Sequence, residues 1–291
     1  MRFSSVEAFG REGRAHLAKG PVALIFAEDG VELGSTLTHC AGLGFAATVV
    51  LHPPGLEMPA EAEWLAQVVC DMDGPGNGPG GIAATLSRIF AAAPAGTWIY
   101  WGFNAEYLFF PFCETRSVGE LLAFHGEERR AAMMATVVDL YAGDLDRFPD
   151  GVDRGAPLFD GRGYYALDRY GADGVQLERQ ADIFGGLRWR FEDHVPWTRR
   201  RIDRVALVQT APGLVMRPDL TLSDEERNTS ACPWHRNLTA AILSFRAAKA
   251  LRSSPRSRPL VRDFRWSGSV PFGWSSRELM ERGLMEPGQW F

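Results

Sequence analysis

Two polar residues interrupt the most apolar stretch of the chain, WIYWGFNAEYLFFPF, which spans residues 98–112. Asn104 and Glu106 follow the aromatic run, and a buried amide or carboxylate needs a hydrogen-bond partner or a ligand. Two oxygens spaced in this way at the end of a strand can bind a divalent cation, and ligands of open α/β sheets lie beyond such strand ends. The alternative is structural: Asn104 caps a turn and Glu106 pairs with an arginine.

A second candidate group lies in RWRFEDHVP, residues 188–196. Arginine binds phosphate in a bidentate manner, and a carboxylate beside it can accept a proton from a hydroxyl group. We therefore predict that Arg188 and Arg190 neutralise phosphate and that Asp193 acts as a general base, which the neighbouring arginines keep ionised. The alternative is a cluster of surface ion pairs, which would contribute little to stability.

Three further candidates are single residues. Asp139 follows an apolar, β-branched pair at an expected strand end, which makes it the second choice for the base. Cys232 and His235 in CPWH have a spacing that could bind zinc, but the sequence has no second pair to complete four ligands. We expect His235 to form the wall of a pocket or to precede a helix, and His125 to lie on the solvated face of a helix.

The elements that must position these residues follow from the spacing of apolar residues. Apolar runs at residues 21–27 and 45–51 enclose a segment with helical spacing, and another strand is predicted at residues 97–103. This alternation predicts a doubly wound α/β half. Glu28 and Asp29 fall where its first strand ends.

The second half of the chain is less regular. Residues 118–140 have helical spacing and pass into a β-branched run, whereas residues 150–187 are rich in Gly, Asp, Tyr and Arg and predict long loops. A strand is predicted at residues 202–210 and an amphipathic helix at residues 239–251.

The order of the segments ALIFAEDGVELGSTLTHCAGLGF, TVVL and WIYWGFNAEYL resembles that of the family 2-type glycosyltransferases of the GT-A fold, particularly the bacterial glycosyltransferase 2-like group. The resemblance covers residues 20–112. It implies an α/β fold with a GT-A-like doubly wound mixed sheet flanked by helices, and a loop-rich, aromatic C-terminal half. It also implies one domain over residues 1–291, in which residues 1–112 bind a nucleotide and residues 113–291 form the acceptor side and a C-terminal extension.

The resemblance assigns roles to the strand-end residues. In this family the carboxylates of an Asp-x-Asp motif hold a divalent cation that neutralises the diphosphate of a nucleotide-sugar, and Asn104 with Glu106 occupies that place. When Glu106 is matched to the family's Glu-Phe-Leu, the two Asp positions become Phe103 and Ala105. Asn104 and Glu106 are then the remaining ligands for Mn²⁺ or Mg²⁺. A neutral amide oxygen binds hard cations less well than a carboxylate, so we expect metal dependence to be weak or absent.

These observations predict a glycosyltransferase that moves a sugar from a nucleotide-sugar donor to a glycan or another cell-surface acceptor. Its base would be Asp193, with Asp139 next in line. The expected contacts to the nucleotide-sugar come from Glu28, Asp29, Asn104, Glu106, Arg188, Arg190 and His235. The missing Asp pair favours an alternative, a catalytically silent relative that binds a nucleotide, a glycan or a partner protein. A third interpretation, a protein that presents its aromatic C-terminus to a partner, rests on Trp266, Phe272, Trp274, Trp290 and Phe291.

Composition limits the partners further. The 291 residues include 36 acidic and 31 basic side chains, a formal charge of −5, which argues against binding to nucleic acid. No apolar stretch has the pattern of a signal peptide or a membrane span. The four cysteines stand singly, so we expect a reducing compartment, the cytoplasm. The oligomeric state does not follow from the sequence.

Overall fold

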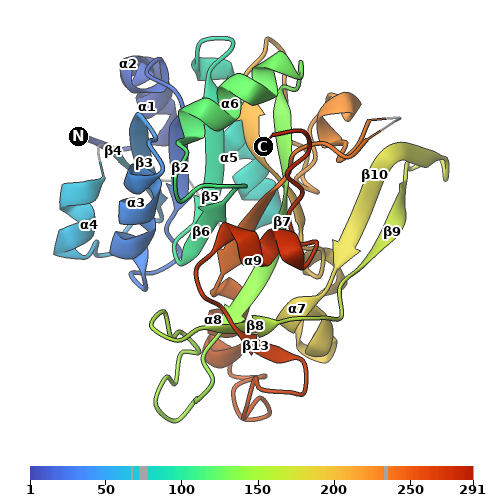
Figure 1. Ribbon diagram of the computed structural model, residues 1–291. Helices are drawn as coiled ribbons and strands as arrows, with labels where there is room; N and C mark the ends of the chain where they lie inside the picture. Colours follow the sequence, from blue (N-terminus) through green and yellow to red (C-terminus); the bar gives the residue numbers. More distant parts are fainter. Residues whose placement is uncertain (67, 72–77, 233–234, 291) are drawn as a thin grey trace. The chain divides into compact units, whose positions relative to one another are not determined.

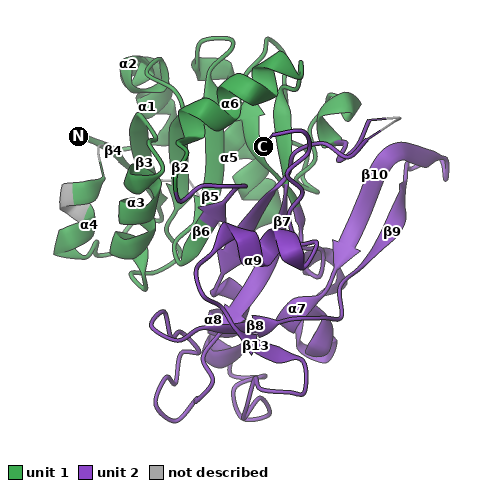
Figure 2. Ribbon diagram, in the orientation of Figure 1, with its two compact units in different colours: residues 1–107, 115–134, 204–228 green, residues 108–114, 135–203, 229–291 purple. Residues whose placement is uncertain are grey.

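The computed structural model describes residues 1–66, 68–71, 78–232 and 235–290. The chain forms two compact units, drawn in green and purple in Figure 2. Unit 1 contains residues 1–107, 115–134 and 204–228, and unit 2 contains residues 108–114, 135–203 and 229–291. The chain first leaves unit 1 after Tyr107, and two later segments, residues 115–134 and 204–228, return to it.

Unit 1 contains a mixed sheet with the strand order β1, β4, β3, β2, β5 and β11 (Figure 1). Strand β11 is antiparallel to β5, and the other neighbours are parallel. The bounds are β1 (Arg2–Phe3), β2 (Val22–Phe26), β3 (Ala47–His52), β4 (Val68–Asp71), β5 (Trp98–Phe103) and β11 (Asp203–Gln209). The strands predicted at residues 21–27, 45–51, 97–103 and 202–210 are confirmed.

Helices accompany the strands of unit 1, as a parallel sheet requires because both of its faces must be covered. They are α1 (Val6–Glu12), α2 (Arg14–Leu17), α3 (Leu33–Gly42), α4 (Ala60–Leu65), α5 (Pro79–Ala92) and α6 (Val118–Glu127). Helix α3 buries Leu33, Leu37 and Cys40 at helical spacing. Helix α6 begins with a capping box, in which Ser117 and Glu120 each bond the other's backbone N–H.

The order of the parallel strands reverses at β2. From β2 the chain builds β3 and β4 on one side and then returns to add β5 on the other side. The carboxyl ends of β2 and β5 therefore flank a topological switch point, the place where open α/β sheets bind their ligands. Glu28 and Asp29 follow β2, and Asn104 follows β5, so all three lie at this point.

Unit 2 is built from shorter strands and helices. The long strand β7 (Ala132–Tyr141) enters unit 2 at Ala135 and pairs in parallel with β12 (Ala240–Ser244). Strand β8 (Leu158–Asp160) is antiparallel to both β7 and β13 (Ser269–Pro271). The remaining elements are the hairpin of β9 (Tyr165–Tyr170) and β10 (Gln176–Phe184), with α7 (Gly186–Arg190), α8 (Arg246–Ser253) and α9 (Ser276–Glu281). Strand β6 (Glu106–Phe109) contains the boundary between the units.

Predictions for three segments of the second half are wrong. The helical spacing expected over residues 118–140 holds only for α6, because residues 132–141 form β7. The segment 239–251 is not one helix, because Ala240–Ser244 forms β12, whose five residues are all buried, and only α8 is helical. A short apolar run fits a buried strand as well as a helix, so spacing alone could not separate them. The segment 150–187 contains β8, β9 and β10 instead of only loops, and the polar residues of the exposed hairpin obscured its alternation.

His125 does not lie on a solvated helix face. It is 1% exposed, its Nε2 lies 2.9 Å from the Ala132 carbonyl oxygen, and its ring contacts Trp98 edge to face. Burial lowers the pKa of His125 to about 4. The spacing of Val118, Leu121 and His125 shows that one face of α6 carries all three.

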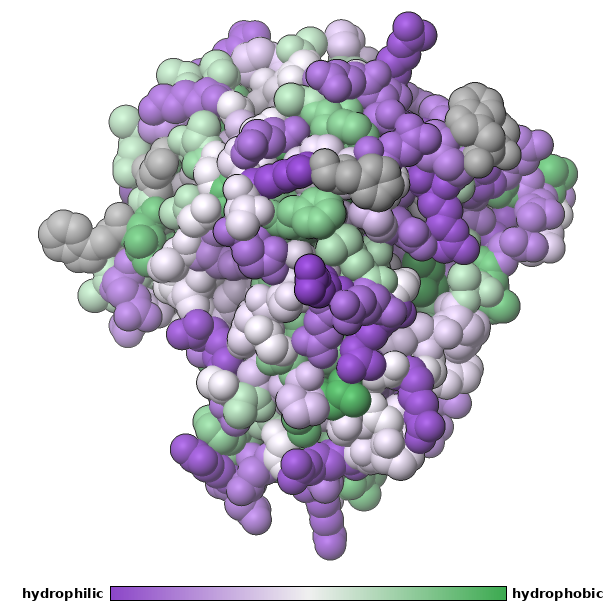
Figure 3. All heavy atoms as spheres, viewed as in Figure 1, coloured by the Kyte–Doolittle hydropathy of each residue, from purple (hydrophilic) through white to green (hydrophobic). Residues whose placement is uncertain are grey.

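Two surface features bear on the expected partners. No helix in the described part of the chain is long and apolar enough to cross a membrane. The face viewed in Figure 3 carries hydrophilic side chains interspersed with smaller apolar areas.

Of the C-terminal aromatic residues, Phe272 and Trp290 are buried against Phe109 and Phe110, respectively, while Phe291 lies outside the described residues.

Candidate functional site

The residues at the switch point of unit 1 form a connected group, which we call the switch-point cluster: Glu28, Asp29, Glu32, Asn104 and Tyr107. Its centre is Asn104, which is fully buried. The Asn104 Oδ1 atom accepts a hydrogen bond of 2.8 Å from the Glu28 backbone N–H. The Nδ2 group donates to Asp29 Oδ1 at 2.6 Å and to the Val31 carbonyl oxygen at 2.9 Å. The end of β5 thereby holds the loop after β2 in a fixed conformation.

Local backbone geometry explains how the cluster is held. Asp29 Oδ1 also accepts from the Val31 N–H at 2.9 Å, the bond that defines an Asx turn. Glu32 and Ala105 have φ of 53° and 60°, in the left-handed region that such residues rarely occupy. The Ala105 N–H donates to Thr36 Oγ1 at 2.9 Å, which ties this strained turn to α3. Strain of this kind is concentrated at functional sites.

Tyr107 extends the cluster toward α3. Its hydroxyl donates to Glu32 Oε2 at 3.2 Å and lies 2.8 Å from Ser35 Oγ, which also bonds the Glu32 carboxylate. The ring of His39 contacts Tyr107 edge to face. Sequence reasoning missed Glu32, Ser35 and Tyr107. Their spacing from the predicted strand ends was the available signal.

Glu106 belongs to a separate, buried ion pair within unit 1. Its carboxylate accepts two hydrogen bonds from the Arg204 guanidinium, at 2.6 and 3.1 Å, and one from the Phe103 N–H at 3.0 Å. Glu106 and Arg204 are 1% and 7% exposed, and the guanidinium lies over the Trp101 ring. The structural alternative stated for Glu106, a pair with an arginine, is therefore observed.

The expected metal ligands do not fit a cation. Both Glu106 oxygens bind Arg204, and the amide atoms of Asn104 are bonded to protein groups. Among the residues that the structure describes, no group of three or more His, Cys, Asp and Glu side chains is placed to bind a metal. Asn104 and Glu106 are thus engaged in holding the surrounding backbone and Arg204.

The predicted phosphate-binding arginines lie in unit 2, in a group that we call the acid–arginine cluster: Asp139, Tyr141, Asp160, Arg188 and Arg190. Arg188 donates to Asp139 through its Nε and its backbone N–H, both at 3.2 Å. Arg190 donates to Asp160 at 2.7 and 3.1 Å, and Tyr141 donates to the same carboxylate at 2.6 Å. Both carboxyl groups are 1% exposed.

This arrangement differs from the predicted phosphate clamp. Arg188 and Arg190 bind buried carboxylates, and Asp193 is not the acid that they pair with. Burial raises the pKa of Asp139, and the adjacent Arg188 opposes that effect. Gly186, with φ of 65°, allows the contact, because a Cβ there would lie 2.9 Å from Asp139 Oδ2.

Asp193 instead lines an open pocket of unit 2 with a volume of about 480 Å³. The pocket is lined by Glu192, Asp193, His194, Val195, Pro196, Arg200, Ser254, Arg256 and Ser257. Asp193 is exposed, and Arg200 binds the neighbouring Glu192 at 2.8 Å. The sequence analysis identified Asp193 as a candidate but missed Ser254, Arg256 and Ser257, which line the same pocket. No local sequence motif links these three residues to Asp193.

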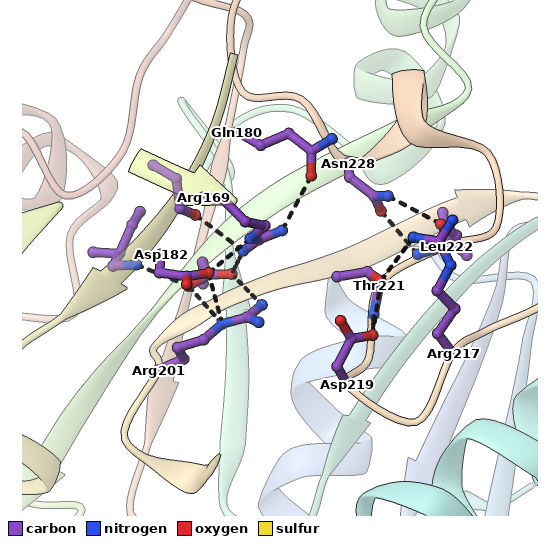
Figure 4. Close-up of polar contacts among 12 residues, drawn as sticks. Arg169, Gln180, Asp182, Arg201, Arg217, Asp219, Thr221, Leu222 and Asn228 are labelled. Carbon is purple, nitrogen blue, oxygen red and sulfur yellow. Dashed lines mark hydrogen bonds and ion pairs between the residues drawn. The ribbon is translucent and has the colours of Figure 1, made fainter. Parts of the chain in front are cut away.

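Two other groups of polar contacts stabilise the fold, an ion-pair network in unit 2 and an Asx turn in unit 1 (Figure 4). In unit 2, Arg169 binds Asp182 and Asp203 at 2.7 and 2.5 Å, and Arg201 binds the same two acids. In unit 1, Asp219 Oδ1 accepts from the Thr221 N–H and hydroxyl, which forms a second Asx turn. Arg201 therefore pairs with Asp182 and Asp203 of unit 2.

His235 lies in unit 2, where its Nδ1 is 2.9 Å from Cys232 Sγ. Residues 233–234, between these two, lie outside the described part of the chain. Strand β12 follows His235 in place of the expected helix.

Comparison with known proteins does not extend these observations. No sequence model of a known protein family matches the chain, and no curated protein is detectably similar to it.

Proposed function

We propose that the protein is a glycosyltransferase that binds a nucleotide-sugar at the switch-point cluster of unit 1. The observation that carries the proposal is the position of Glu28 and Asp29 after β2, fixed by Asn104 after β5, at a topological switch point. Carboxylates at such points accept hydrogen bonds from ribose hydroxyls. Glu28 and Asp29 are partly exposed, so they can reach a ligand.

The finer fold assignment is part of the same proposal. A parallel α/β half with its acids at the switch point is compatible with a GT-A-like nucleotide-binding half.

The four cysteines are all free thiols, which supports a cytoplasmic location.

Phosphate charge would be neutralised by groups other than a bound metal, because the side-chain atoms that were expected to bind a metal already bind protein groups.

The general base in this proposal is Asp193, which lines the pocket of unit 2. Asp193 is exposed there beside His194, so it is accessible to a hydroxyl group of a glycan. Asp139 is the weaker candidate, because it is buried and bound to Arg188. In this account Asp193→Asn leaves nucleotide binding intact and lowers turnover by a factor on the order of 10² to 10⁴.

A catalytically silent binding protein is the second candidate. It is favoured by Phe103 and Ala105, which replace the two carboxylates of the resembled motif, and by the burial of Glu106 against Arg204. Such a protein would bind the nucleotide at the same cluster without sugar transfer.

A thermal-shift screen tests the proposal. UDP, GDP, dTDP and CMP are each added with Mg²⁺, with Mn²⁺ or with EDTA, and a ligand present at 100 times its Kd should stabilise the native state by about 2.7 kcal/mol. We expect at least one nucleotide to raise the Tm equally in EDTA. An assay for nucleotide released from the corresponding nucleotide-sugar then distinguishes the two candidates, because only the enzyme releases it. The absence of a Tm shift with every nucleotide would overturn both candidates.

The matched control is Asp219→Asn. Asp29 and Asp219 both accept a backbone N–H two residues ahead in an Asx turn of unit 1, but only Asp29 lies at the switch point. Asp29→Asn should reduce the nucleotide-dependent stabilisation by at least about half, and Asp219→Asn should leave it unchanged.

A further inference from the structure

The loop that follows α8, residues 254–265, concentrates positive charge in an acidic chain, and we call it the basic loop. The whole chain has a formal charge of −5, but this loop contains Arg256, Arg258, Arg262 and Arg265 and a single acid, Asp263. The four arginines are exposed. In the described part of the chain their hydrogen bonds involve only their own backbone atoms, so the guanidinium groups are available to an anionic partner.

Leu260 lies within the basic loop and is 68% exposed. The turn around it is fixed, because the Arg252 Nη1 group donates to the carbonyl oxygens of Arg258 at 3.1 Å and Val261 at 2.7 Å. The buried Ser257 hydroxyl donates to a carbonyl oxygen of α8 at 2.7 Å. A single exposed leucine is ordinary on a protein surface. This one is held in solvent by a fixed turn and has exposed arginines on both sides in the sequence, so one loop presents apolar and cationic groups together.

The adjoining loop, residues 144–155, is acidic but forms no ion pair with the basic loop among the residues that the structure describes. The two loops meet at Arg252, whose Nε donates to the Pro149 carbonyl oxygen at 2.9 Å. Three of the four acids in the adjoining loop, Asp144, Asp150 and Asp153, accept backbone N–H groups of their own loop. These acids stabilise turns, and the arginines of the basic loop keep an unpaired charge.

We propose that the basic loop docks unit 2 on a bilayer that contains anionic lipids. The arginines bind phosphate groups of the lipid headgroups, and Leu260 enters the interface beside them. Stable attachment to a membrane surface takes two signals, and this loop supplies both charge attraction and an apolar side chain. Nucleic acid would use the arginines but would leave Leu260 in water, so a bilayer fits the loop better. The docking is independent of nucleotide binding at the switch-point cluster of unit 1.

Co-sedimentation of the wild-type protein with lipid vesicles tests the proposal. Vesicles of phosphatidylcholine and phosphatidylglycerol in equal parts are compared with vesicles of phosphatidylcholine alone. We expect at least about tenfold tighter binding to the anionic vesicles, because each arginine near such a surface contributes about fivefold. Absence of binding to the anionic vesicles, or equal binding to both kinds, would overturn the proposal.

The contribution of the arginines is tested with the double variant Arg258→Glu/Arg262→Glu. The matched control is Arg11→Glu/Arg14→Glu in unit 1, which changes the net charge equally at exposed positions outside the loop. We expect the first variant to bind anionic vesicles at least about 25-fold more weakly than the wild type. The control should bind within about twofold of the wild type, because salt screens charges that lie away from the bilayer. Equal weakening by both variants would show that net charge, and not the basic loop, attracts the protein.

The contribution of the apolar side chain is tested with Leu260→Ser, and Leu167→Ser in β9 is the control because Leu167 is 50% exposed. We expect Leu260→Ser to bind anionic vesicles at least about fivefold more weakly and Leu167→Ser to bind like the wild type. Near-ultraviolet circular dichroism verifies that the variants are folded, and if one is not, the wild-type comparison of the two kinds of vesicle decides alone. Equal binding of folded Leu260→Ser and Leu167→Ser would show that the loop does not enter the bilayer interface.

Discussion

The acids of the two units lie in strands or just beyond them, but they have different surroundings. At the switch-point cluster, Asp29 accepts from the uncharged amide of Asn104 and remains partly exposed, as does Glu28. In the acid–arginine cluster, Asp139 and Asp160 are buried, and each binds a guanidinium. A carboxylate held by an amide at the surface can accept a ligand hydroxyl, whereas one buried against an arginine is part of the scaffold.

Under the proposed function, we expect this difference to separate residues that bind a ligand from residues that only stabilise the fold. Removing one partner of a buried pair leaves an uncompensated charge in a region without water, so the cost falls on stability. We expect the change of a partly exposed acid at the switch-point cluster to have little effect on stability and to weaken binding of the proposed ligand. The following predictions test this separation.

The largest expected effect follows from Arg190→Met in the acid–arginine cluster. Asp160 would lose its buried ionic partner, and the free energy of unfolding should fall by about 3–5 kcal/mol. Urea-induced unfolding measures this change. The control Arg11→Met breaks an exposed pair with Glu7 and should cost less than about 1 kcal/mol. Equal, small effects of both substitutions would show that the cluster does not hold unit 2.

A pH-dependent effect of about 3 kcal/mol is expected from His125 in unit 1. Its pKa is lowered from 6.5 to about 4, so between these values the unfolded chain binds the proton more readily. The stability that this group contributes is present above about pH 6.5 and is lost as the pH falls toward 4. His125→Gln should remove most of this loss in urea unfolding at pH 7 and pH 4.5. An unchanged pH dependence would contradict the buried neutral imidazole.

Asp139 should show the opposite dependence on pH in unit 2. Burial raises the pKa of its carboxyl, so the folded protein keeps this proton to a higher pH than the unfolded chain. The associated stability is present at low pH and is lost as the pH rises through the folded-state pKa. The free energy of unfolding of Asp139→Asn minus the wild-type value should therefore increase as the pH rises, because only the wild-type protein loses this stability. A trend in the other direction would indicate that Arg188 controls this carboxyl.

The smallest expected effect on stability is that of Asp29→Asn. The asparagine can still accept the Val31 N–H, so the free energy of unfolding should change by less than about 1 kcal/mol. Urea unfolding of Asp29→Asn and Arg190→Met under one condition measures the contrast between the two clusters. A loss for Asp29→Asn as large as that for Arg190→Met would place Asp29 among the structural acids.

The first half of the fold could be predicted from the sequence because its strands are short apolar runs with polar ends. The position of Glu28, Asp29 and Asn104 beyond those ends followed from the same pattern. The pairing of Glu106 could be stated only as an alternative, because its partner Arg204 lies 98 residues further along the chain. No local pattern shows a contact of that range.

The second half was harder to predict for the same reason. Asp193 and the arginines at 188 and 190 are neighbours in sequence, but the arginines bind acids contributed by β7 and β8. Strand β12 has an apolar run that also fits a helix, and its parallel pairing with β7 decides the outcome. Long-range pairing, and not residue spacing, determines which charges in this half stay available to a ligand.

Isothermal titration calorimetry of nucleotide binding in EDTA tests the central claim most directly. The account predicts that the nucleotide selected in the thermal-shift screen binds the wild-type protein and Asp219→Asn with equal affinity. Asp29→Asn should bind it at least tenfold more weakly, a loss of about 1.4 kcal/mol. Equal affinities of Asp29→Asn and Asp219→Asn, or no binding to the wild-type protein, would contradict the assignment of the switch-point cluster as the nucleotide site.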